Sequence, residues 1–140
     1  EAVLAFSEKP IGSSTSKRDY SPFRDWTESK RSAVSADEHV ASCSLATADW
    51  PQRLDSGRTW LSSGAINTAF YAILPPNSPI PDCGSSNNGG NGVFTARSYH
   101  PGGVQAAMVD GSVRFFTSST SIKVWRALGT RAGGEVVDLP

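Results

Sequence analysis

Alternating apolar residues near the C-terminal end of the chain predict a β-hairpin. Positions 104, 106 and 108 are apolar, Asp110-Gly111 follows, and a second strand-forming run occupies 112–117. An Asp-Gly pair between two such runs favours a two-residue type I′ turn, in which both turn residues need a positive φ. The resulting register predicts three cross-strand pairs on the core face: Met108 with Val113, Ala106 with Phe115, and Val104 with Thr117.

His100 and Asp110 lie at opposite ends of this predicted hairpin. A strand advances about 3.3 Å per residue, so the steps from Val104 to Val109 separate its base from its tip by roughly 17 Å. A general base and its orienting carboxylate must lie within about 3 Å of each other, so these two residues are poor candidates for a catalytic dyad. We interpret Asp110 as a turn residue. His100 precedes Pro-Gly-Gly, which leaves it to pack against a helix, cap one or lie exposed.

The periodicity changes to a helical one after the hairpin. Ser119, Thr120 or Ser121 can cap a short helix that ends at Leu128, where Gly129 is a natural stop. Arg126 is expected to point outward. The residues expected to face the core are Ile122, Trp125 and Leu128. The glycine-rich residues 131–137 predict a short strand or an extended tail.

A second helix is predicted from the capping box Ser35-Ala-Asp-Glu38. It runs to about Thr47 and is followed by Trp50-Pro51. Its apolar stripe contains Ala36, Val40, Cys43 and Thr47. The two short helices are expected to pack on or beside the sheet.

The remaining segments predict strands separated by long polar connections. Val3 to Phe6 favours a strand, and 10–24 a polar, mobile loop. Alternation over 70–74 indicates a strand, although a helical turn also fits so short a window. The prolines of 75–81 predict an extended path, and 84–92 a flexible Gly/Asn/Ser loop.

Three sequence blocks carry a resemblance to a known family. The run TARSYHPGGVQAAMVDGSVRFF, followed by VWRALGTRAGGEVV, resembles the C-terminal signature of the bacterial prepilin-type H-X9-DG family. The upstream segment NTAFYAILPPNSPIPDC and the opening LAFSEKPIGS also resemble family segments. The resemblance covers most of the chain and marks His100, Asp110 and Gly111 as signature residues. It departs from the family pattern in a few positions: Tyr99, Gln105, Met108 and the inserted residues 80–82.

The resemblance implies a pseudopilin-like, secreted cell-envelope protein. Family members begin with a processing site and a long apolar helix, whereas no run here approaches the roughly 20 apolar residues that span a bilayer. We therefore expect a single soluble domain, 1–140, that is the C-terminal part of a larger protein. Its expected location is the periplasmic or cell-surface side of the envelope. The implied role is a non-catalytic structural or assembly module of a filament or secretion apparatus, with other envelope subunits as partners and membrane attachment only through the N-terminal helix.

Composition and charge agree with one loop-rich globular domain. The chain has 140 residues, and its 13 basic and 13 acidic residues cancel. This balance gives no electrostatic footprint for nucleic acid or an anionic membrane, and no cofactor is predicted. We predict an α+β fold: an antiparallel sheet with a C-terminal β-hairpin and two short packed helices, as in a pilin-like globular head.

The two cysteines predict a disulfide between Cys43 and Cys83, the usual state in an exported protein. Free thiols are one alternative. Another is a Cys2His2 zinc site, because His39 and Cys43 stand four residues apart on one helix and share a face. Cys83 and His100 would complete this site, but their spacing matches no finger motif.

A catalytic alternative also remains open. No GxSxG, P-loop or HExxH motif is present, and acidic pairs such as Asp37 and Glu38 are explained as capping residues. Cys43 with His39 lacks any oxyanion-hole signature. The remaining enzyme hypothesis is a small hydrolase with a site assembled from loops around His100 and His39.

Overall fold

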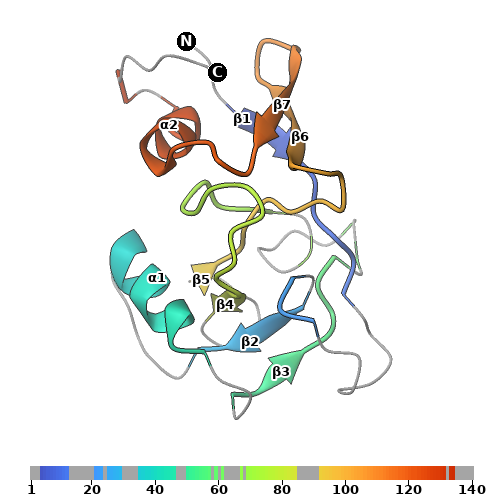
Figure 1. Ribbon diagram of the computed structural model, residues 1–140, viewed down its shortest axis with the longest axis vertical. Coiled ribbons are helices and arrows are strands. Elements are labelled where there is room, and N and C mark those ends of the chain that lie inside the picture. Colours follow the sequence, from blue (N-terminus) through green and yellow to red (C-terminus); the bar gives the residue numbers. More distant parts are fainter. Residues whose placement is uncertain are drawn as a thin grey trace.

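Two small sheets, each with a helix beside it, form the described part of the chain (Figure 1). The computed structural model describes residues 4–12, 21–23, 25–29, 35–46, 50–57, 59, 61, 67, 69–84, 92–131 and 133–134. In chain order the elements are β1 (Leu4–Ser7), β2 (Trp26–Glu28), α1 (Ala36–Ser44), β3 (Gln52–Arg53), β4 (Asp82–Gly84), β5 (Gly92–Val93), β6 (Gly103–Met108), β7 (Val113–Thr117) and α2 (Ile122–Leu128). This confirms the predicted α+β class.

The first sheet has the order β1-β6-β7 and is antiparallel throughout. Strand β1 begins at Leu4, one residue after the predicted start, and Val3 lies outside the described residues. The β6–β7 hairpin is confirmed, but its turn differs from the prediction. The Met108 amide donates to the Ser112 carbonyl at 2.8 Å, which leaves three residues in the loop. Gly111 has a φ of 84°, and Asp110 does not have a positive φ. These features define a turn closed by a left-handed glycine.

The extra loop residue shifts the hairpin register by one position. Val104 pairs with Phe116 and Gln105 with Phe115, so the predicted pairs were wrong. Because a one-residue slip moves a whole strand to the other face, Phe116 is buried while Val113 and Phe115 are 66% and 43% exposed. Three residues of β6 keep their predicted core positions: Val104, Ala106 and Met108.

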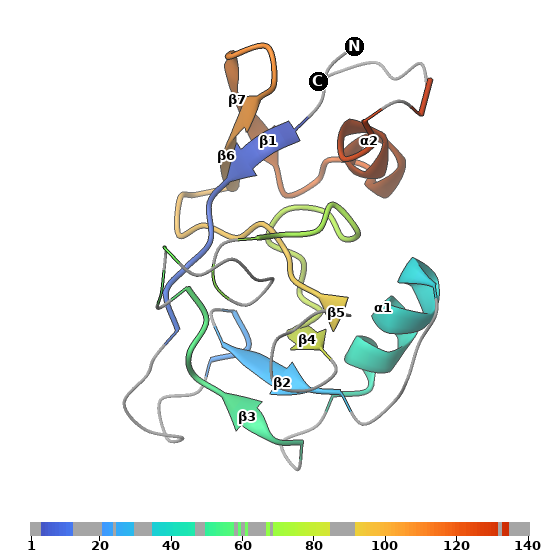
Figure 2. The same cartoon turned by 180° about the vertical axis from the view of Figure 1, so that it is seen from behind.

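Helix α2 covers the core of the first sheet (Figure 2). Among the three candidate caps, Ser121 accepts a hydrogen bond from the Val124 amide at 3.2 Å, and Gly129 ends the helix as predicted. Trp125 packs edge-on against Phe116 with ring centroids 5.4 Å apart. Ile122 is 38% exposed, so its predicted core position was wrong. Ile122 lies in the first turn of α2, outside the face that buries Trp125 and Leu128. The predicted tail falls largely outside the described residues.

The second sheet has the order β3-β2-β4-β5. Strands β2 and β4 pair in parallel, and the other two pairs are antiparallel. The core beside this sheet contains Trp26 and Phe94, whose rings meet edge-on at 5.6 Å. Gly84 and Gly92 pair with each other and are buried, so the predicted loop is shorter at both ends. Residues 85–91, its remainder, lie outside the described residues.

Helix α1 begins where the capping box predicts. The Ser35 hydroxyl accepts a hydrogen bond from the Glu38 amide at 3.2 Å. The helix ends at Ser44, about three residues before the predicted end. Cys43 is buried against β4 and β5, and Val40 packs at the margin of the same cluster. Cys43 and Val40 thus lie on the predicted apolar stripe, and Thr47, its last predicted member, lies outside the described residues.

The segment between 69 and 82 makes turns where a strand and an extended path were predicted. Residues 70–74 do not form a strand, although the Tyr71 amide donates to the Phe94 carbonyl at 2.7 Å. The proline run bends at Asn77, which has a φ of 55°. Asparagine tolerates this left-handed conformation better than most residues. The two views show this segment between the two sheets (Figures 1 and 2). Within the described residues, none of the helices has the length and apolarity needed to cross a membrane.

Candidate functional site

His100 lies in the bend before β6 and is tied to the chain's first segment. Its Nε2 lies 3.0 Å from Oε1 of Glu8, and the His100 side chain is 63% exposed. Its backbone amide donates to the Ser98 hydroxyl at 3.1 Å. The predicted options were packing on a helix, capping a helix and exposure; the structure shows an exposed ring paired with a carboxylate.

Glu8 holds three parts of the fold together. Besides the contact with His100, its Oε2 accepts a hydrogen bond from the Gln105 amide of β6 at 2.8 Å. Its backbone carbonyl accepts from the Arg97 amide at 3.0 Å. Sequence reasoning missed Glu8 because its partners are about 90 or more residues away in the chain. The one available signal was its place in LAFSEKPIGS, a segment already noted for its resemblance.

Asp110 and Gly111 serve the hairpin turn. The Asp110 carboxylate accepts hydrogen bonds from the Ser112 hydroxyl at 2.7 Å and the Ser112 amide at 2.9 Å. These bonds lower the pKa of Asp110, the hydroxyl having the larger effect. The carboxylate thus has its partners within its own turn, whereas the partner of His100 is Glu8. The two signature residues therefore have separate local roles.

A cavity of about 450 Å³ opens beside His100. Its walls come from the segment after β1 and from the segment that leads into β6. The lining residues are Glu8, Lys9, Pro10, Arg97, Ser98, Tyr99 and His100. The volume lies within the range typical of small-molecule sites. This cavity is the candidate functional site, and it contains His100 but not His39.

The Lys9 side chain lies between the cavity and the core that contains Trp26 and Phe94. Its ammonium lies 4.9 Å from the centroid of the Phe94 ring and donates to the Ala69 carbonyl at 3.4 Å. Burial lowers the pKa of Lys9 from 10.5 to about 8. The nearby Asp82 carboxylate opposes this shift, and Arg97 adds to it. Sequence reasoning did not single out Lys9, because burial of a loop lysine depends on contacts distant in sequence.

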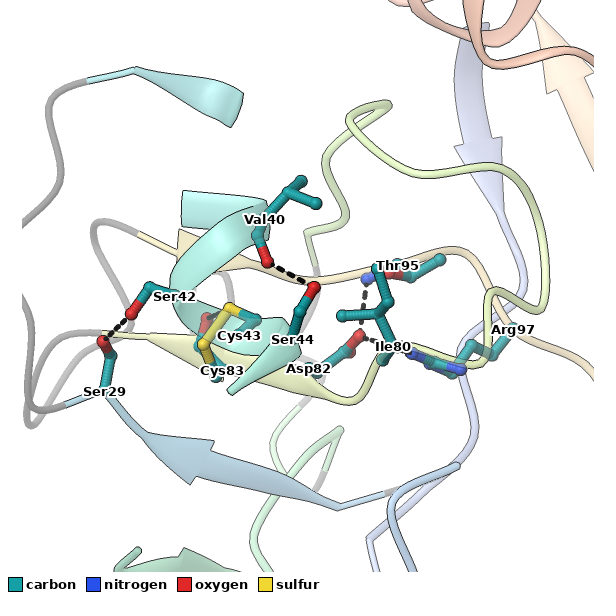
Figure 3. The surroundings of a disulfide bond; sticks show 10 residues. All are labelled: Ser29, Val40, Ser42, Cys43, Ser44, Ile80, Asp82, Cys83, Thr95 and Arg97. Carbon is teal, nitrogen blue, oxygen red and sulfur yellow. Dashed lines mark hydrogen bonds and ion pairs between the residues drawn. A yellow bond between two sulfur atoms is a disulfide. The ribbon is translucent and has the colours of Figure 1, made fainter. Parts of the chain in front are cut away.

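The inner wall of the cavity is fixed by a buried ion pair between Arg97 and Asp82 (Figure 3). Arg97 Nη2 lies 3.0 Å from Asp82 Oδ1, which also accepts the Thr95 amide at 3.0 Å. The guanidinium donates in addition to the Ser78 and Ile80 carbonyls, both at 2.6 Å. Arg97 therefore connects the proline-rich segment to the segment that carries His100. Arg97 belongs to a block that carries the resemblance, whereas Asp82 lies in the inserted residues 80–82, and their pairing had no sequence signal.

Asn77 makes a second connection between these segments. Its Oδ1 accepts the Ser98 amide at 2.8 Å, and its Nδ2 donates to the Gly103 carbonyl at 3.3 Å. The bend at Asn77 places both side-chain groups beside the start of β6. The bend that carries His100 is thus supported from one side by Asn77 and from the other by Glu8.

Cys43 and Cys83 form a disulfide, as predicted (Figure 3). Their Cα atoms lie 5.5 Å apart, and the bond joins α1 to β4. Because both sulfurs belong to the disulfide, neither is a thiolate that could bind zinc together with His39 and His100 in the oxidised protein. Over the described ranges, no cluster of three or more His, Cys, Asp and Glu residues is arranged to hold a metal ion. His39 sits on α1, where its amide donates to the Ser35 carbonyl at 3.1 Å.

Comparison with known proteins gives one match. The model of a family described as "Protein of unknown function (DUF1559)" matches residues 3–123. No curated protein and no solved structure matches the chain. The matched range contains the candidate cavity, both cysteines and all three signature residues.

Proposed function

This chain belongs to the DUF1559 family, and we propose that it is the globular part of an exported, pseudopilin-like envelope protein. In this proposal it is a non-catalytic structural or assembly module of a filament or secretion apparatus. Its partners are other envelope subunits, and an N-terminal apolar helix attaches the protein to the membrane. The finer assignment, to the prepilin-type H-X9-DG group, rests on the sequence blocks around His100 and Asp110.

The observation that carries the proposal is that all three signature residues have structural roles. His100 ties the base of the hairpin to Glu8, Asp110 accepts hydrogen bonds within the turn, and Gly111 supplies its positive φ. A catalytic signature would bring reactive groups within hydrogen-bonding distance around a substrate position. The separate local roles of these residues support the interpretation that the signature maintains the fold.

The disulfide supports export. Disulfides persist in oxidising compartments and are rare where thiols are kept reduced. The bond between Cys43 and Cys83 joins two elements 40 residues apart, and both cysteines are buried. It therefore supports a periplasmic or cell-surface location.

The decisive experiment uses the full-length protein in its native host. We expect its N-terminus to be processed, as shown by mass spectrometry, and the mature protein to appear in filaments sheared from cells or in a crosslinked envelope complex. A version with residues 1–140 behind a cleavable export signal is the matched control and should remain outside the assembly. Recovery of the full-length protein as an unprocessed, unassociated monomer would contradict the proposal.

A hydrolase is the second candidate, and the His100–Glu8 pair favours it. A histidine whose ring contacts a carboxylate beside a cavity is the usual arrangement of a general base and its orienting group. Ser98 lines the same cavity, and its hydroxyl accepts a hydrogen bond from the His100 amide. The pair that the structure provides is therefore His100 with Glu8. The participation of His39 stays a prediction.

A further inference from the structure

Tyr99 presents an aromatic ring at the rim of the cavity. Its side chain is 72% exposed, and its ring packs against Phe23 with centroids 5.1 Å apart at 46°. Phe23 is itself held by the buried Arg97, whose guanidinium carbon lies 5.6 Å from its ring centroid. The Tyr99 ring is thus largely exposed and is held in place by its contact with Phe23. A tyrosine fixed in this way offers contact area to a ligand at a low cost in conformational entropy.

The charged groups that line the cavity already have partners within the protein. The Lys9 ammonium lies over the Phe94 ring and donates to the Ala69 carbonyl. Arg97 is neutralised by Asp82 and also donates to two carbonyls. Glu8 is paired with His100 and accepts the Gln105 amide. An anion or a cation entering the cavity would have to compete with these existing pairs. The cavity is therefore better suited to a ligand without net charge.

The groups at the opening can still form hydrogen bonds. Carboxylate oxygens have about four acceptor positions, so Glu8 retains acceptor capacity beyond its two partners. Because Nε2 of His100 faces Glu8, the other ring nitrogen, Nδ1, is left for a ligand. Ser98 also lines the cavity, and its hydroxyl can donate a hydrogen bond. Several hydrogen-bonding groups beside one aromatic face match a ligand that has hydroxyl edges and a weakly polar C–H face.

A pyranose ring has this chemistry. We propose that the cavity lined by Glu8, Ser98, Tyr99 and His100 binds a neutral saccharide. The ring of Tyr99 contacts the C–H face of one pyranose, because the negative face of an aromatic ring attracts weakly positive C–H groups. Glu8, Ser98 and His100 bind the hydroxyl groups. The volume of about 450 Å³ accommodates a small saccharide, and the open rim admits the end of a longer chain.

This inference is independent of the proposed assembly role and is tested on the purified 140-residue chain. The probes are cellobiose, maltose and N,N′-diacetylchitobiose, with glucuronate and inorganic phosphate as charged comparisons. Binding is followed by NMR shifts of the backbone amides. We expect at least one neutral disaccharide to shift the amides of 97–100 saturably and with higher affinity than either anion.

Substitutions of exposed aromatic residues test which side chain contacts the saccharide. Tyr99→Ala should weaken binding roughly two- to tenfold, the value of a favourable aromatic contact, while Tyr99→Phe retains most of the affinity. Phe115→Ala removes a different exposed aromatic side chain, on β7, and should leave binding unchanged. Circular dichroism confirms that each variant is folded. The proposal is overturned if no neutral disaccharide binds, if the shifts occur elsewhere, if phosphate or glucuronate binds more tightly, or if Tyr99→Ala has no effect.

Discussion

Arg97 and Asp82 form a buried ion pair between the segment that leads into β6 and the first residue of β4. Their facing atoms lie 3.0 Å apart, and their side chains are 3% and 7% exposed. Arg97 stands three residues before His100, and Asp82 stands beside Cys83. The pair therefore connects the disulfide region to the candidate cavity.

Removing either partner of this pair should strongly destabilise the protein. Arg97→Gln or Asp82→Asn leaves the other charge buried without its partner, which typically costs about 3 to 5 kcal/mol. The measurement is the free energy of unfolding in urea. Arg114→Gln, at an exposed position on β7, is the matched control and should change it by less than about 0.5 kcal/mol. Equal small effects of all three substitutions would show that the pair contributes little.

The disulfide should account for a large part of the stability. Oxidised protein should show no free thiols and a mass about two daltons below that of the reduced chain. A 40-residue closure corresponds to about 4 kcal/mol in the chain-entropy model, so Cys43→Ser should cost about 2 to 4 kcal/mol. The double substitution of Cys43 and Cys83 should match the reduced wild type. Stoichiometric zinc with two titratable thiols would instead support the metal-site hypothesis.

Gly111 should matter more to the hairpin than the charge of Asp110. Gly111 has a φ of 84°, and open space surrounds the position of a Cβ, so the cost of a side chain there is one of backbone strain. Gly111→Val should destabilise the fold by more than about 1 kcal/mol, and Gly111→Asn by less. Asp110→Asn keeps an acceptor for Ser112 and should have little effect. The reverse ranking would assign importance to the carboxylate itself.

Lys9 should make stability depend on pH in the alkaline range. Its pKa falls from 10.5 to about 8 on folding, so between these values the unfolded chain binds more protons than the folded one. The free energy of unfolding contributed by Lys9 therefore rises with pH over this window. The difference between wild type and Lys9→Met isolates this contribution from other groups. Parallel pH profiles for the two proteins would rule out the shift.

Replacing His100 distinguishes the two candidate functions. His100→Ala removes an exposed contact between Nε2 and Glu8 and should cost no more than about 1 kcal/mol of stability. Glu8→Gln, whose amide oxygen still accepts a hydrogen bond from the Gln105 amide, should behave similarly. Under the structural proposal, neither substitution changes the negligible turnover of activated esters, phosphates or glycosides. Robust turnover that falls 10²- to 10⁴-fold in His100→Ala, with an unchanged melting temperature, would instead identify a general base.

Local sequence signals correctly predicted the elements that depend on residues close together in the chain. The capping box set the start of α1 at Ser35, and Gly129 marked the end of α2. The cap of α2 was narrowed to three neighbouring residues, of which the structure uses Ser121. Alternation and Asp110-Gly111 identified the hairpin, and Cys43 and Cys83 were paired correctly. Each depends on residues close in sequence or, for the cysteines, on the only possible pairing.

Only the tertiary structure decided the hairpin register, the second sheet and the residues around His100. Asp-Gly is compatible with loops of two or three residues, and burial of Phe116 against Trp125 accompanies the longer loop. The parallel pairing of β2 with β4 and the contact of Glu8 with His100 join segments far apart in the chain. Such contacts form because the folded chain brings distant groups together, and no local pattern encodes that proximity.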